Sequence, residues 1–250
     1  DPTADIGGYD AAQKAGILAS LAFHTTVPAD AVYREGITGV SLDDVRSARK
    51  AGYVVKLLAI CEKLLDPETG REGVSARVYP ALVPDEHPLA AVHGANNAVF
   101  VEAEAAGPLM FYGAGAGGIQ TASAVLGDVV SAARRHVAGG PGVAESTHAN
   151  LPVLPISAVT TRYQITLQVA DQPGVLASIA TLFSEHGVSV ETVEQSVAST
   201  GGGDGAAAPA ATLVIGTHEA TEADLAATVA ALTTSTVVHS VTGVLRVEGL

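Results

Sequence analysis

The sequence predicts an α+β protein made of two units in series. The first is a mixed sheet with helices, and the second is a smaller unit of the order β-α-β-β-α-β. Three observations support this prediction. Strand-like runs joined by turns indicate hairpins in the first half. A stretch rich in Gly and Pro, without periodicity, separates the halves and is typical of a linker. After this stretch, segments with strand-like alternation of apolar residues are followed by segments with helical periodicity. We therefore expect domains at 1–137 and 160–250, joined by a linker at 138–159.

The composition limits the classes of function that need considering. The chain has 250 residues, 48% of them apolar, which is enough for one large core or two modest ones. Its formal net charge is −13 and it has no basic patch, which argues against a nucleic-acid partner. No apolar run is long enough to cross a bilayer, so we expect no membrane partner. Because the first residue is not Met, we expect the chain to be a piece of a longer protein.

The cysteine and histidine content argues against two further kinds of site. A single cysteine, Cys61, excludes a disulfide framework and a Cys-based zinc site, and it suits a cytoplasmic location. His87 and His93 are six residues apart, and neither H-x-x-x-H nor H-E-x-x-H occurs. We therefore expect no metal site built from this chain.

The N-terminal segment runs from a polar loop into a predicted helix over 11–23. This helix is apolar almost all round, so we expect it to be buried. Asp10 and Lys14 are four residues apart in its first turn and share one face. A partly desolvated lysine beside a carboxylate can release a proton near neutral pH. The alternative is structural, with Asp10 as the helix N-cap and Lys14 extending to solvent, and the spacing alone does not decide between them.

Helices and a hairpin are expected next. A short helix is expected at 29–34. Ser41 and Asp44 form a variant capping box that opens a helix running to Ala51. Two strands follow, at 53–64 and 73–79, separated by the strong turn signal Asp66-Pro67-Glu68-Thr69-Gly70. The first strand also fits a helical pattern, but its β-branched start favours a strand. The proline-containing stretch 80–88 is predicted to be a loop.

A second hairpin, with strands at 98–104 and 109–112, leads into a glycine-rich bend. Gly113, Gly115 and Gly118 satisfy G-x-G-x-x-G, but no acidic residue ends a second strand about twenty positions on, so we do not interpret them as a dinucleotide-binding fingerprint. Glycines still let a ligand approach the backbone, and a helix N-terminus favours an oxygen ligand. A tight turn without a ligand is the alternative.

The helix that follows, predicted over 121–136, carries one continuous apolar stripe. Its members are Ala122, Val125, Leu126, Val129, Val130 and Ala133. Some partner has to cover such a stripe.

The second unit follows the ferredoxin-like order. Its predicted elements are a strand at 162–170, a turn at 171–174, a helix at 175–186, a strand at 188–197, a flexible loop at 199–209, a strand at 211–217, a helix at 221–232 capped by Thr221, and a strand at 237–247.

Two segments carry a resemblance to a known family. DPTADIGGYDAAQKAGIL resembles the substrate-site segment of homoserine dehydrogenase, and HGANNAVFVEAEAAGPLMFYGAGAGGIQTASAV is similar to a distal segment of the same family. The resemblance covers residue 1 to about 136. It implies interconversion of L-aspartate 4-semialdehyde and L-homoserine by hydride transfer with NAD or NADP. It also implies that Lys14 is the general acid/base, that Asp10 and Lys14 bind substrate, and that Asp5 supports them.

The same resemblance implies a cofactor-contacting bend made of Gly113, Gly115, Gly117 and Thr121. The family's N-terminal dinucleotide-binding domain and a substrate-binding glutamate have no counterpart in this sequence. We therefore expect the apolar stripe at 121–136 to be uncovered, and this chain alone to bind and turn over no NADPH.

The second half resembles an ACT domain, an amino-acid-sensing module. The resemblance implies an effector site, with threonine as the expected ligand, at Asp171, Gln172, Gly174, Val175 and Leu176. It also implies a homodimer or homotetramer. An accessory domain without a ligand is the alternative for this half. For the whole chain the alternative is a non-catalytic amino-acid-sensing or dimerisation module. Convergence of Asp10, Lys14 and Gly115 on one pocket would favour the enzyme.

Overall fold

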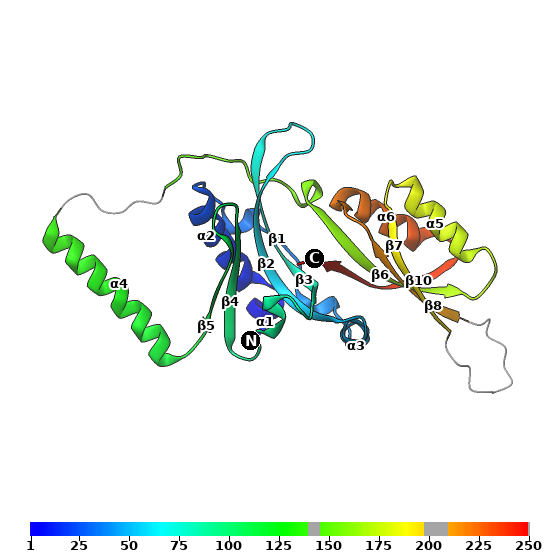
Figure 1. Cartoon of the computed structure of the whole chain (residues 1–250), viewed down its shortest axis with the longest axis horizontal. Coiled ribbons are helices and arrows are strands. Elements are labelled where there is room, and N and C mark those ends of the chain that lie inside the picture. Colours follow the sequence, from blue (N-terminus) through cyan, green and yellow to red (C-terminus); the bar gives the residue numbers. More distant parts are fainter. Residues whose placement is uncertain (140–145, 198–209, 250) are drawn as a thin grey trace.

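The computed structural model describes residues 1–139, 146–197 and 210–249, and its fold is α+β, as predicted. Figure 1 shows the two units side by side, with helix α4 standing away from both. The first unit contains α1 (Thr3–Ile6), α2 (Tyr9–Phe23), β1 (Tyr33–Arg34), α3 (Leu42–Lys50), β2 (Tyr53–Leu65), β3 (Glu72–Pro84), β4 (Asn96–Ala103), β5 (Gly107–Ala114) and α4 (Gly118–Ala138). Short 3₁₀ turns lie at 29–31, 37–39 and 88–91.

The first unit is built on the long β2–β3 hairpin, which confirms the choice of strand for residues 53–64. The two strands pair in antiparallel register from Tyr53 opposite Pro84 to Leu65 opposite Glu72. The capping box of Ser41 and Asp44 is also confirmed, since both reciprocal hydrogen bonds are present. A capping box satisfies backbone donors that the first helical turn leaves free.

Three sequence-based expectations for this unit are wrong in detail. Residues 80–84 continue β3 instead of starting a loop, because this stretch is buried between neighbours and a proline removes only one backbone donor. The predicted helix at 29–34 is a 3₁₀ turn followed by β1, which pairs with β3. Helix α2 buries only its small residues, while Ile17 and Leu21 are 62% and 60% exposed.

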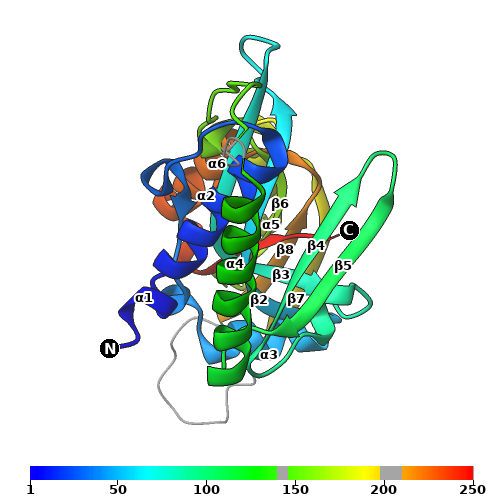
Figure 2. The ribbon, with the colours of Figure 1, turned by 90° about the vertical axis from the view of Figure 1, so that its left-hand side faces the viewer.

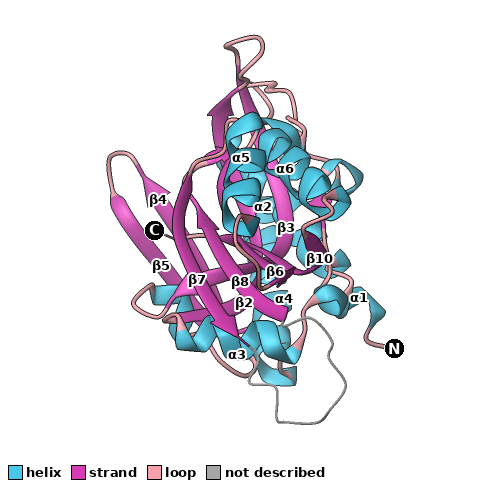
Figure 3. Cartoon of the chain, turned by 90° about the vertical axis from the view of Figure 1, so that its right-hand side faces the viewer, coloured by secondary structure: helices cyan, strands magenta, loops and turns pink. Residues whose placement is uncertain are grey.

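The second unit has the predicted ferredoxin-like order. Its elements are β6 (Thr160–Ala170), α5 (Val175–Glu185), β7 (Val190–Val197), β8 (Ala210–Thr217), β9 (Ala220–Thr221), α6 (Glu222–Thr234) and β10 (Val238–Val247). The four long strands lie in the order β10-β6-β8-β7 with antiparallel pairing, and their core includes Ile165, Phe183 and Leu225. Figure 3 shows α5 and α6 together against this sheet. The loop predicted at 199–209 lies outside the described residues.

A single sheet runs through both units. Strand β10 pairs with β6 on one side and, at its C-terminal end, in parallel with β3, through Arg246 opposite Ala81 and Val247 opposite Leu82. The main path is therefore β1-β3-β10-β6-β8-β7. Any shift of the second unit against the first must consequently act on β10.

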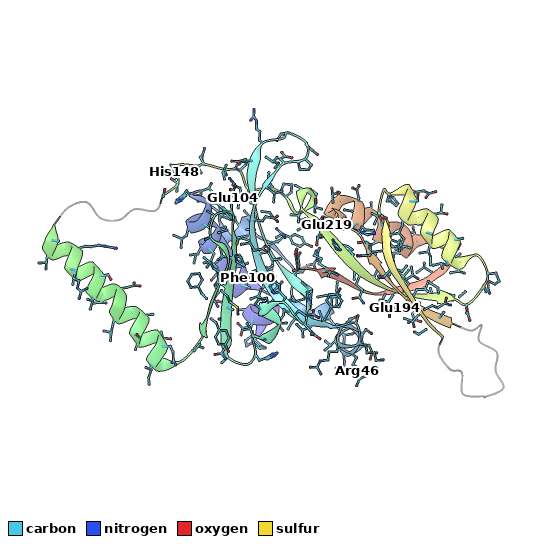
Figure 4. The ribbon with its side chains drawn as sticks, viewed as in Figure 1. Arg46, Phe100, Glu104, His148, Glu194 and Glu219 are labelled. Carbon is cyan, nitrogen blue, oxygen red and sulfur yellow. The ribbon has the colours of Figure 1, made fainter. Side chains whose placement is uncertain are left out.

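The segment expected to be a linker makes specific contacts with the first unit. The Val74 amide donates to Pro152 O at 2.9 Å, and the Leu154 amide donates to Val74 O at 2.8 Å. The His148 ring, labelled in Figure 4, lies 4.8 Å from that of His24 at the end of α2. The second part of this segment is thus packed onto β3 and α2.

Helix α4 buries none of its residues, which confirms that its apolar stripe is uncovered. The stripe residues Val125, Leu126 and Val129 are each more than half exposed. In Figure 2 the helix stands in front of the rest of the first unit as a separate rod. Among the described residues, no helix is both long and apolar enough to cross a membrane.

Candidate functional site

The predicted substrate loop is a tight turn between two helices. Helix α1 ends at Ile6, with Gly7 as its C-cap, and Gly8 is the N-cap of α2 in the left-handed region, with a φ of 74°. A non-glycine residue rarely adopts this conformation, so the turn depends on glycine. Asp10 is inside the first helical turn, and the alternative that it is the N-cap is therefore wrong.

Asp10 and Lys14 form an ion pair at the start of α2. Lys14 Nζ donates to Asp10 Oδ2 at 2.6 Å, and the two side chains are 49% (Asp10) and 56% (Lys14) exposed. The expected pairing is present, but the expected desolvation is not, because the face of α2 that carries them is open. Solvent-exposed pairs of this kind contribute little to stability. The pair is therefore available to a ligand.

Residues 34–36 form a bed under the substrate loop. Arg34 Nη1 donates to Gly7 O at 2.6 Å, and its guanidinium lies 3.5 Å from the centroid of the Tyr9 ring. A Cβ on Gly36 would lie 2.9 Å from Gly7 Cα, so only glycine allows the two segments to come this close. The position of the loop therefore depends on the position of this bed.

A buried cluster of charges next to the bed was not predicted. Arg246 of β10 lies between two carboxylates, with Nε and Nη2 donating to Glu222 at 2.6 and 3.0 Å and Nη1 and Nη2 donating to Glu35 at 2.7 and 3.2 Å. The Arg246 guanidinium also lies 4.3 Å from the Tyr79 ring centroid. Tyr163 donates to Glu222 at 2.8 Å. We call Arg246, Glu35 and Glu222 the Arg246 joint.

The contacts between Arg246 and Glu35 shift the pKa values of these two groups in opposite directions. Burial acts to raise the pKa of Glu35, but hydrogen bonds from Arg246 and Tyr33 and the positive charge on Arg246 outweigh it, so this pKa lies below its usual value. Burial acts to lower the pKa of Arg246, but its two carboxylate partners outweigh burial and raise it. For Tyr33, burial and the neighbouring Glu35 raise the pKa to about 12. Arg246 and Glu35 are therefore both ionised at neutral pH.

The glycine-rich bend follows β5 and caps α4. The Gly115 amide donates to Ala95 O at 3.0 Å, and a Cβ at Gly115 would overlap the Asn97 side chain. Gly117 is the N-cap of α4 with a φ of 143°, a conformation that favours glycine. Gly113, Gly115, Gly117 and Thr121 are all exposed. In the described residues no hydrogen bond or ion pair joins the bend to Asp10 or Lys14, so the structure does not bring the two parts of the predicted site together.

The hairpin that leads to the bend contacts the body of the first unit through an aromatic pair. Phe100 of β4, labelled in Figure 4, packs edge-on against His87, with ring centroids 4.8 Å apart. On β5, Phe111 and Tyr112 are 65% and 58% exposed. The bend therefore lies at the end of an element that has few contacts with the body.

Four of the five predicted effector residues, all except Gly174, line one open pocket of about 310 Å³. It is lined by Val169, Ala170, Asp171, Gln172, Pro173, Val175, Leu176, Gln195 and Leu213. Gly174 is the N-cap of α5 with a φ of 91°, and no side chain caps this helix. Gln195 Nε2 donates to Asp171 Oδ1 at 3.3 Å, which fixes one wall of the pocket. Among the described residues, no group of three or more potential ligating side chains could hold a metal ion.

Comparison with known proteins identifies the family. The homoserine dehydrogenase profile matches residues 1–130, more than half of the chain. The chain belongs to the homoserine dehydrogenase family. An ACT-domain profile matches residues 163–234, within the second unit. The homoserine dehydrogenase of Corynebacterium glutamicum is 53% identical over 99% of this chain and 54% of its own length, and that of Mycobacterium tuberculosis H37Rv is 56% identical over 100% and 56%.

Solved structures of the family share this fold. A homoserine dehydrogenase from Thiobacillus denitrificans superposes with a TM-score of 0.87 at 34% identity and covers 99% of this chain and 55% of that one. The enzyme from Staphylococcus aureus at pH 6.0 gives 0.64 at 28% identity over 100% and 56%. This chain thus spans about half the length of the relatives it matches.

Proposed function

We propose that this chain is the substrate-binding and regulatory part of a homoserine dehydrogenase. The full protein would interconvert L-aspartate 4-semialdehyde and L-homoserine with NAD or NADP, in the cytoplasm, on the route to threonine, methionine and isoleucine. The observation that carries the proposal is the Asp10–Lys14 pair at 2.6 Å on an open face of α2, within the segment that matches the family. An ammonium beside a carboxylate is suited to move a proton at a carbonyl oxygen.

In the proposed reaction Lys14 acts at the oxygen of the substrate. Its Nζ donates a proton to the carbonyl oxygen of the semialdehyde as a hydride reaches the carbon, so that a hydroxyl forms instead of a free alkoxide. In the reverse direction Nζ receives that proton. Asp10 orients Nζ and accepts hydrogen bonds from the substrate ammonium, and Asp5 supports the loop.

The glycine-rich bend fits an oxygen-bearing ligand. A Cβ on Gly113 or Gly118 would meet nothing within 4 Å, and the first-turn amides of α4 have no side-chain cap. Gly113, Gly115, Gly117 and Thr121 would therefore hold the edge of a nicotinamide cofactor at the start of α4. When bound, this cofactor supplies or accepts the hydride. Parts of the full protein outside this chain would bind most of it.

We further propose that the second unit senses threonine and that the protein forms a homodimer or homotetramer. The uncapped helix start at Gly174 beside the 310 Å³ pocket supports the first proposal, because free backbone amides can hold a carboxylate. The exposed apolar side chains of β5 support the second. A non-catalytic amino-acid sensor would keep the pocket but would not need the Asp10–Lys14 pair.

The test compares two lysine variants of the full-length protein that contains this chain. Lys14→Ala is expected to lower kcat about 10²- to 10⁴-fold, the usual contribution of a general acid/base. The matched control is Lys63→Ala, because Lys63 also forms an exposed ion pair, with Glu72 at 3.1 Å, but lies outside the proposed site. NADPH absorbance measures the rate. A Lys14→Ala variant as active as the control would exclude the proposed role.

A further inference from the structure

The Arg246 joint is not used by the proposed mechanism, yet it connects the second unit to the substrate loop. We propose that Arg246 is a positioning residue that ties the substrate loop, residues 5–8, to the C-terminal unit, and that a change in the C-terminal unit reaches the substrate through it. This inference rests on the proposed function, because it assigns a source of control to the same site.

The first half of the joint belongs to the C-terminal unit. Arg246 lies in β10, and Glu222 is the first residue of α6. Both carboxylate oxygens of Glu222 accept hydrogen bonds from the Arg246 guanidinium. The two side chains are 7% and 5% exposed. A bidentate arginine–carboxylate pair fixes orientation as well as distance. Any movement of α6 relative to β10 therefore moves the Arg246 guanidinium.

The second half of the joint belongs to the first unit. The same guanidinium donates to both oxygens of Glu35, the residue that follows β1. The Glu35 backbone is anchored as well, since its amide donates to Val78 O of β3 at 2.8 Å. Arg246 thus donates hydrogen bonds to one carboxylate from each unit.

Glu35 is directly connected to the substrate loop by its chain neighbours. Arg34 holds Gly7 O, and Gly36 lies against Gly7 without room for a side chain. A Cβ on Gly8 would lie 3.5 Å from Glu35 O, so the loop contacts all three residues of the bed. Asp10 follows Gly8 by two residues and Lys14 follows it by six, both in α2. In the proposed function Asp10 accepts hydrogen bonds from the substrate, so a small shift of the bed is sufficient to weaken substrate binding.

The segment that contains Glu35 has space to move. A cavity of about 330 Å³ lies between it and β10, and its lining includes Glu35, Gly36 and Val40 of this segment and Gly243, Val244 and Leu245 of β10. If this space were filled by side chains, packing would hold residues 35–40 in place even without Arg246. With open space beside it, the Glu35 side chain is held by its charge contacts, and the backbone by the hydrogen bond to Val78 O.

The test uses the full-length protein and isosteric variants of the two carboxylates. Glu35→Gln keeps the shape of the side chain and leaves Arg246 paired with Glu222. Glu222→Gln likewise leaves Arg246 paired with Glu35, so each single variant retains one ion pair. Glu191→Gln is the control, because Glu191 forms an ion pair with Arg162 at 3.3 Å on the surface of the second unit. KM for homoserine, kcat and the unfolding temperature are measured for each variant and for the double variant.

We expect each single variant to raise KM for homoserine about threefold to thirtyfold, with a smaller change in kcat, and the control to change neither. The effects on KM should be less than additive in the double variant, because both single variants break the same connection. Its unfolding temperature should fall further, because Arg246 is then left buried without a carboxylate partner. A wild-type KM in Glu222→Gln, or effects that simply add, would overturn the inference. An inactive wild-type protein would instead remove the proposed function, and the inference with it.

Discussion

Replacing Arg246 by Met should destabilise the protein far more than replacing an exposed arginine. Methionine has a similar volume but no charge, so Glu35 and Glu222 would face each other without a counter-ion. Removing one partner of a buried ion pair costs about 3–5 kcal/mol. The Glu222 side chain is 5% exposed and cannot rehydrate, whereas that of Glu35 is 40% exposed and partly can. We therefore expect about 3 kcal/mol.

Thermal unfolding followed by circular dichroism measures this loss. For a protein of this size 1 kcal/mol corresponds to about 2–4 °C, so the expected decrease in Tm is roughly 6–12 °C. The control is Arg162→Met, which breaks two exposed pairs, with Glu191 at 3.3 Å and Glu219 at 3.6 Å, and should change Tm by no more than a few degrees. Glu219 is labelled in Figure 4 near β6, on the outside of the second unit.

The pH dependence separates charge from packing as the cause. Without Arg246, burial would favour the neutral forms of the two carboxyls that it now pairs with. The penalty is then present at neutral pH and shrinks as the pH falls toward 5 and the carboxyls take up protons. A deficit below 1 kcal/mol at pH 7, or one that stays constant down to pH 5, would refute this account of the joint.

Three further outcomes are expected. Because the pKa of Glu35 is lowered in the folded protein, its ion pair stabilises the fold above the unfolded pKa of about 4.3. This stabilisation is lost as the pH falls through the lower folded pKa, so Glu35→Gln should flatten the decrease in Tm below pH 5. Burial raises the pKa of the Cys61 thiol to about 11, so at pH 8 it should react with a disulfide reagent roughly two hundredfold more slowly than an unfolded control, measured by absorbance. The isolated chain should show no NADPH binding in a fluorescence titration. Its uncovered α4 should bind a hydrophobic dye, and Leu126→Glu with Val129→Glu should reduce dye binding without lowering Tm.

Local patterns were sufficient to predict most elements of this fold. The second unit follows the predicted order because each strand and helix carries its own period and its own turn residues. The capping box at Ser41 and the cap at Thr221 were predictable because their partners are three residues away. The β2–β3 hairpin was predictable because a turn signal separates two apolar runs.

What failed depended on contacts between distant segments. Residues 80–84 extend β3 because β2 and β10 cover them, and β10 comes more than 150 residues later. The helix predicted at 221–232 places Glu222 in its first turn, yet this side chain is buried against Arg246. The sequence of β10 does contain one signal of a buried ion pair, because the charged residue Arg246 follows Leu245 in a strand that is otherwise largely apolar. Its partner Glu35 lies 211 residues away, and no single-sequence pattern connects them.

The exposure of Lys14 limits what this chain can do by itself. A general acid transfers its proton most effectively where water is excluded, because competing hydration is removed and electrostatic effects are stronger. Here 56% of the Lys14 side chain is open to solvent, and the neighbouring Ile17 and Leu21 of α2 are exposed as well. Under the proposed function these apolar residues are the surface against which the rest of the full protein closes, drying the Asp10–Lys14 pair. Ile17→Asp should then lower kcat in the full-length protein while leaving the Tm of the isolated chain unchanged, because in the chain alone this side chain is already in water.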